Sequence, residues 1–72
     1  MSSNNRMTVR YVQVYLQHIY NKRWDNEGAH IAEDELYMDV LKAIAEGRCD
    51  DPAACASEAL KSDNIDFVRW YA

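Results

Sequence analysis

The sequence has few of the residues that most often mark a chemical site. Its 72 residues include two glycines, one proline, two cysteines and two histidines. With two glycines in total, the chain has no glycine-rich loop to cradle a phosphate group. Five residues separate Cys49 from Cys55 and eleven separate His18 from His30, which is unlike the close ligand pairs of zinc sites. We therefore expect no metal, no cofactor and no small-molecule substrate.

Long hydrophobic runs are also absent. No run approaches the roughly 18 residues of a membrane span, and the opening MSSNNRMTV lacks the apolar segment of a secretory signal. These absences predict a cytoplasmic protein without a membrane partner. In that compartment Cys49 and Cys55 would stay reduced, although a disulfide between them is geometrically conceivable.

The stretch GRCDDPAAC, residues 47–55, is the most concentrated group of reactive side chains. Asp51 and Pro52 together are typical of a helix start, because aspartate caps the first turn and proline has no N–H to leave unsatisfied there. Cys55 would then lie one turn into the helix, where Asp50 and Asp51 oppose a thiolate. We predict no catalytic residue, with thiol or metal chemistry as a minor alternative.

Acidic residues are missing from the first third of the chain. Residues 1–24 contain four bases and no acid, whereas residues 25–72 contain all twelve acids and four bases. The first part therefore carries +4 and the rest −8, for a net charge of −4. Such asymmetry can steer a partner or pair two copies, and the acidic balance argues against a general nucleic-acid binder.

The composition is that of a small folded protein. Apolar residues make up 49% and aromatic residues 11% of the chain, which is too much for a disordered tail. We expect a flexible polar leader over residues 1–7 and a single helical domain over residues 8–72. A domain of this size buries only about 60% of its unfolded surface and is marginally stable.

We predict an all-α fold, a small compact bundle of four helices of which the last two are short. The first helix, residues 8–24, is β-prone in composition but has helical periodicity. The second helix follows a break at Gly28 and has the acidic residues 33–35 in its first turn. It ends near Glu46 and is capped by Gly47. The third runs from Pro52 to about Ser62, and the fourth begins at Asp63. The predicted core residues are Val9, Val12, Leu16, Ile19, Leu36, Tyr37, Val40, Leu41, Ile44, Cys55, Ala56, Ala59, Leu60, Ile65, Phe67, Val68, Trp70 and Tyr71.

The first helix has a second apolar stripe, nearly opposite its core stripe. Its members, at spacings of four, three and four, are Met7, Tyr11, Val14 and His18. Either the helix is central in its own domain, or this stripe meets another chain because the core is small. In the second case His18 would make association sensitive to pH near about 6–7.

The second helix has an acidic face formed by Glu35, Asp39 and Glu46, with Lys42 able to pair with Glu46. Such a face is usually only solvated, but its carboxylates can also imitate nucleic-acid phosphates. We therefore predict a non-enzymatic protein–protein interaction or regulatory module that can self-associate through its first helix. The alternatives are an acidic inhibitor of a nucleic-acid-handling complex and a nucleic-acid-binding module that uses the basic first helix.

Overall fold

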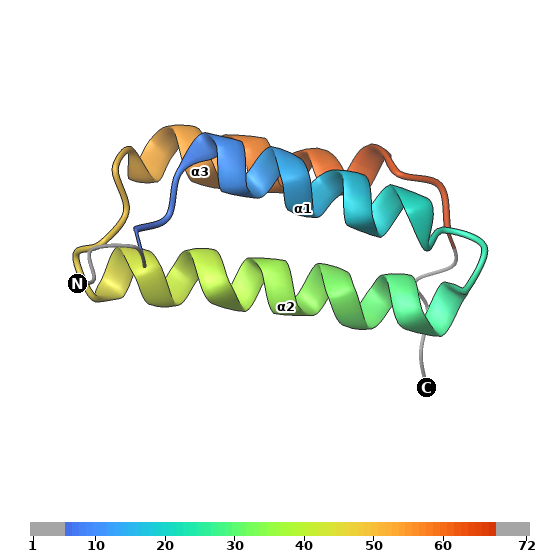
Figure 1. The fold of residues 1–72 in the computed structure, drawn as a ribbon. Coiled ribbons are helices and arrows are strands. Elements are labelled where there is room, and N and C mark those ends of the chain that lie inside the picture. The colour runs from blue at the N-terminus through green and yellow to red at the C-terminus, as the bar shows by residue number, and fades with distance from the viewer. Residues whose placement is uncertain (1–5, 68–72) are drawn as a thin grey trace.

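The computed structural model describes residues 6–67 and confirms an all-helical fold. Three α-helices, α1 (Val9–Asn21), α2 (Asn26–Ala45) and α3 (Pro52–Ala59), are followed by the 3-10 helix η2 (Leu60–Asn64). Figure 1 shows α1 and α3 lying side by side along α2, and each of the three helices contacts the other two. The described residues form no strand, only one isolated bridge between Met7 and Cys49.

Residues 6–67 contain three α-helices and not the predicted four, and part of the predicted fourth helix lies outside these residues. The chain continues from α3 directly into η2, without the break at Asp63 that was expected to start another α-helix. This segment is a 3-10 helix, which winds more tightly than an α-helix, and its residue Ser62 is fully buried. Phe67 is buried and Ile65 packs partly against the core, while Val68, Trp70 and Tyr71 lie outside the described residues.

Each α-helix begins at a polar side chain that satisfies a backbone amide of the first turn. The side chains of Thr8, Asp25 and Asp51 accept hydrogen bonds from the amides three residues further on. Pro52 occupies the first turn of α3, which confirms the start predicted from the Asp-Pro pair. These caps fix where the three helices begin.

The predicted break at Gly28 is wrong, because Gly28 lies inside α2. Asp25 caps α2, and a Cβ atom at Gly28 would stand only 2.6 Å from the Asp25 carboxylate. The Asp25 carboxylate is the end of a flexible side chain, and the same cap forms onto Tyr11 in α1 and Ala54 in α3, so Gly28 is an ordinary first-turn residue without a positive φ. Gly47, with φ of 72°, does have the left-handed conformation expected after the second helix.

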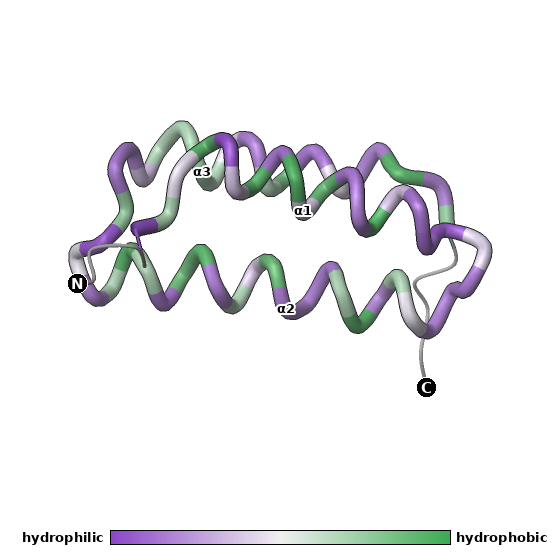
Figure 2. The backbone as a smooth tube through the Cα atoms, in the orientation of Figure 1, coloured by the Kyte–Doolittle hydropathy of each residue, from purple (hydrophilic) through white to green (hydrophobic). Residues whose placement is uncertain are grey.

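The core lies along the axis between the three helices. Figure 2 shows hydrophobic segments spaced along all of them. Among the largest fully buried side chains are Val12, Ile19 and Leu36, as the periodicity predicts. Leu41 and Leu60 were expected in the core but are 62% and 63% exposed, because they lie at the outer edges of α2 and η2.

The residues before α1 are tied to the turn that follows α2. The Met7 amide donates to the Arg48 carbonyl at 2.8 Å, and the Asp50 amide donates to the Met7 carbonyl at 3.0 Å. Arg6 forms an ion pair with Asp50. Met7, the last residue of the predicted leader, is therefore buried in the core, while residues 1–5 of that leader lie outside the described residues.

Candidate protein-binding face

The predicted second stripe of the first helix divides between the core and the surface. Met7 precedes α1 and its side chain is 4% exposed, whereas Tyr11 is 42% and Val14 58% exposed. His18 is also exposed, one turn beyond Val14. The outward part of the stripe therefore consists of the three residues that lie within α1.

Two hydrogen bonds, one from Tyr11 of this stripe and one from the neighbouring Tyr15, join α1 to the predicted acidic face of α2. The Tyr11 hydroxyl donates to Asp39 Oδ2 at 3.4 Å, and the Tyr15 hydroxyl donates to Glu35 Oε1 at 3.0 Å. Two surfaces that are separate in the sequence thus form one exposed surface of the bundle. We call it the α1–α2 face, and its residues are Tyr11, Val14, Tyr15, His18, Glu35 and Asp39.

The aromatic residues of the α1–α2 face form a row along α1. The ring centroids of Tyr11 and Tyr15 are 6.0 Å apart, and those of Tyr15 and His18 are 5.6 Å apart with an interplanar angle of 77°. Such offset and edge-on contacts favour a fixed arrangement of the rings. The row therefore presents a preorganised aromatic surface beside two carboxylates.

Glu46, the third predicted acidic residue, has a different environment. It follows the last residue of α2 and accepts a hydrogen bond from Arg48 Nε at 2.6 Å. The predicted pairing of Glu46 with Lys42 is replaced by this contact. Lys42 is exposed and makes no ion pair among residues 6–67.

Both tyrosines of the face hold their protons more tightly than usual. Partial burial is the main cause, and the Asp39 carboxylate adds to it by raising the pKa of Tyr11. At Tyr15, burial together with the hydrogen bond to Glu35 raises the pKa from 10.0 to about 12. The hydroxyls therefore remain donors to the carboxylates throughout the neutral range.

We expect this pKa shift to appear in the pH dependence of stability. The pKa of Tyr15 is about 12 in the folded protein, against an ordinary value of 10.0 for tyrosine, so its stabilising contribution is complete below about pH 10 and is lost as the pH rises through about 12. Tyr15→Phe should therefore show a shallower loss of stability between about pH 10 and 12. Urea unfolding at several pH values measures this, and equal slopes for both proteins would contradict it.

Glu35→Gln is the matched control for that experiment. It removes the charge of the acceptor but keeps an oxygen that can accept from Tyr15. The Tyr15 pKa should then fall from about 12 toward its ordinary value. Ultraviolet absorbance of the phenolate reports this change directly.

The two cysteines are free thiols in the core. Burial, followed by a hydrogen bond with Cys49, raises the pKa of Cys55 to about 11. A thiol in this environment is a weak nucleophile at neutral pH, because the thiolate is the reactive form. Among residues 6–67, no three histidine, cysteine or acidic side chains are grouped so that they could hold a metal ion.

The basic residues of the first third do not form one continuous surface. Arg6 pairs with Asp50 at one end of the bundle. At the other end, the Arg23 guanidinium lies 3.8 Å from the ring centroid of Tyr20 and 4.5 Å from that of Trp24. These two cations are thus engaged with groups of the chain itself.

An exposed apolar side of α2 was missed by the sequence reasoning. Ile31 is 52%, Met38 53% and Leu41 62% exposed. Their spacing of seven and three residues is the signal that could have revealed it. This spacing does not stand out in the sequence, because Leu41 also fits the predicted core pattern. Met38 has a predicted core residue, Tyr37, on one side and a residue of the acidic face, Asp39, on the other.

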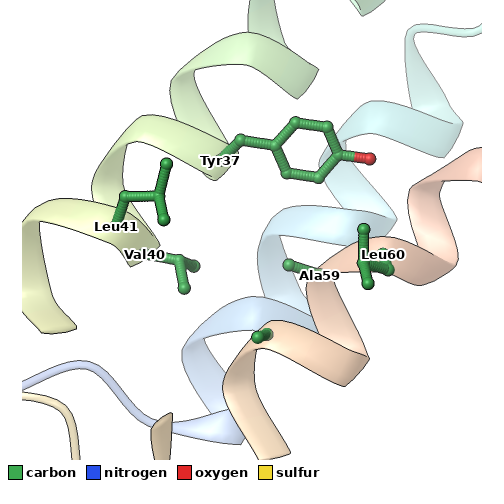
Figure 3. A pocket seen from close by; sticks show the side chains of 6 residues that line it. Tyr37, Val40, Leu41, Ala59 and Leu60 are labelled. Atoms are coloured by element: carbon green, nitrogen blue, oxygen red, sulfur yellow. The ribbon is translucent and has the colours of Figure 1, made fainter. Parts of the chain in front are cut away.

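A groove adjoins this side of α2. Figure 3 shows Tyr37, Val40 and Leu41 facing Ala59 and Leu60 across it. Its volume is about 280 Å³, and Ala56 completes the lining. Because this lining is almost entirely apolar, the groove offers no polar group that could orient a substrate.

Comparisons with known proteins add no functional assignment. No helix within residues 6–67 has the length and hydrophobicity needed to cross a membrane. The chain matches no protein-family model, no curated protein and no solved structure.

Proposed function

We propose that this chain is a non-enzymatic interaction module that works in the cytoplasm and binds a protein partner through the α1–α2 face. The observation that carries the proposal is the pair of hydrogen bonds from Tyr11 to Asp39 and from Tyr15 to Glu35. They hold aromatic rings and carboxylates together on an exposed surface. Tyrosine is enriched at protein interfaces because it combines a large apolar area with a polar tip.

The partner we propose is a basic protein segment with apolar side chains. Two of the six residues of the α1–α2 face, Glu35 and Asp39, are acidic and none is basic, although Lys42 lies one turn beyond Asp39. Two copies of the chain meeting through this face would bring carboxylates against carboxylates, which is unfavourable. A partner that carries lysine or arginine would instead find charge complementarity, and its apolar groups would cover Val14 and the rings.

A second candidate function is regulation of a nucleic-acid-handling complex. It would use the same surface, because Glu35 and Asp39 would occupy a site that otherwise binds phosphates. The two candidates differ in what the captured partner does. If its nucleic-acid binding is lost when the module is bound, the regulatory version is correct.

The proposal is tested by capture of partners from lysate of the native cells with the tagged full chain. We expect a basic protein to be retained at about 0.05 M salt and released at about 0.5 M, because salt screens exposed charges. Charge reversal with Glu35→Lys and Asp39→Lys should abolish its retention. Val14→Asp, which places a charge among the apolar groups, should weaken it.

The matched control reverses two acids elsewhere, with Asp63→Lys and Asp66→Lys. Both residues are exposed, and the net charge changes by the same amount as in the test variant. Retention should be unchanged in this control. Equal loss in both double variants would mean that net charge alone is recognised, and the proposed face would be wrong.

A further inference from the structure

The exposed apolar side of α2 is a second surface, distinct from the α1–α2 face. Ile31, Met38 and Leu41 are each more than half exposed, and Ala45 is exposed as well. Their spacing of seven, three and four residues places them on one stripe of the helix. We call it the α2 stripe. It extends over much of a 20-residue helix, which is about 30 Å long.

This stripe is more than a set of isolated exposed side chains, because it is continuous with the groove. Leu41 belongs to both, and Leu60 forms the opposite edge of the groove (Figure 3). Single exposed hydrophobic residues are ordinary on a protein surface, whereas a continuous patch of this kind marks an interaction site.

Besides Glu27 near its start, two charges beside the centre of the α2 stripe indicate what covers it. Asp34 lies four residues before Met38, and Lys42 lies four residues after it. Asp34 is 66% exposed and has His30 at 3.8 Å as its nearest ion-pair partner. The acid and the base are thus placed symmetrically about the centre of the stripe.

We propose that a second copy of this chain docks on the α2 stripe with its own α2 antiparallel. In this arrangement the two-fold axis passes close to Met38, and Lys42 of each copy lies opposite Asp34 of the other. A parallel arrangement would place Asp34 against Asp34 and Lys42 against Lys42, which is repulsive. The stripe is therefore self-complementary in one direction only, as a two-fold interface requires.

The apolar contacts are compatible with the same arrangement. Met38 of one copy packs against Met38 of the other near the axis, Ile31 of each copy lies opposite Ala45 of the other, and the contact extends toward the groove beside Leu41. Methionine adapts its shape readily at such a contact. The interface is centred on one helix from each copy, so we expect a weak dimer that dissociates on dilution.

Sedimentation equilibrium of the full chain across a concentration series tests the proposal. We expect the mass to rise from 8.4 kDa toward twice that value as the concentration increases. Met38→Asp should keep the chain monomeric throughout the series. Val14→Asp changes an equally exposed residue of the α1–α2 face and should leave the association unchanged, so self-association is separated from binding of the basic partner.

Charge exchange tests the direction of pairing. Asp34→Lys alone and Lys42→Asp alone should each weaken the dimer by about tenfold, since each creates two repulsive pairs. The double variant with both changes should restore the dimer, because the pairs re-form with opposite polarity. A monomeric wild-type chain overturns the proposal, and so does a double variant that associates no better than the single ones.

Discussion

Leu36→Ala will lower the free energy of unfolding by about 2–5 kcal/mol. Leu36 is fully buried, and it lies near the middle of α2. Truncation removes contacts that the surrounding side chains cannot fully replace, so a cavity remains. A chain of this size has about 4–11 kcal/mol of total stability, so the variant should lose a large fraction of it. Denaturant unfolding followed by circular dichroism measures this loss.

Leu41→Ala is the matched control, with the same chemical change five residues further along α2. Its side chain is 62% exposed, so it should lose less than about 0.5 kcal/mol at concentrations where the chain is monomeric. The comparison distinguishes the inner side of α2 from the outer side. Similar losses for the two variants would contradict the orientation of the helix.

Ser62→Ala will cost about 1–3 kcal/mol, although it removes a single oxygen atom. Ser62 Oγ donates to Glu33 Oε2 at 2.6 Å, and the Tyr37 hydroxyl lies 2.5 Å from the same Oγ. Since the serine has one hydrogen and gives it to the carboxylate, the tyrosine must be the donor in the second bond. The substitution therefore removes a hydrogen bond from the Glu33 carboxylate, which is 4% exposed, and another from Tyr37.

Tyr37→Phe is the control for this network. It removes the hydroxyl that donates to Ser62 and leaves the bond between Ser62 and Glu33 in place. We expect a smaller loss, about 0.5–1.5 kcal/mol, because no buried charge loses a partner. Thermal unfolding compares the two variants, and a Ser62→Ala protein as stable as the wild type would contradict the role given to this serine.

Much of the fold can be predicted from the sequence where local chemistry decides the outcome. The periodicity of Val12 and Ile19 identifies the inner side of α1 despite its β-prone composition, because burial outweighs intrinsic propensity. Asp51 followed by Pro52 predicts the start of α3, because a capping aspartate and a proline at the first helical position are local signals. Gly47 marks the end of α2, since the chain needs a positive φ there.

Other features depend on packing between segments and escape local reasoning. Gly28 could not be distinguished from a turn glycine, because glycine occurs in turns and also, as here, in the first turn of a helix. The burial of Met7 depends on its bridge to Cys49, which is distant in sequence. Leu41 and Leu60 are exposed although the pattern places them in the core. A small bundle can bury only some of the apolar residues on the inward side of each helix.

The candidate site was predicted in pieces. The helical periodicity of the first helix predicts that Tyr11, Val14 and His18 share one side. The periodicity of the second helix predicts the same for Glu35 and Asp39. The register between α1 and α2 unites them, through the bonds from Tyr11 and Tyr15. No single-helix pattern contains that register, so the composite surface emerges only from the structure.

The most direct test of the binding face is an amide chemical-shift map of the isotope-labelled chain, recorded while the captured basic partner is added. The largest changes should occur at Tyr11, Val14, His18, Glu35 and Asp39, and residues of α3 should change little. Changes centred on α3, or spread evenly over the three helices, would contradict the claim that the α1–α2 face binds this partner.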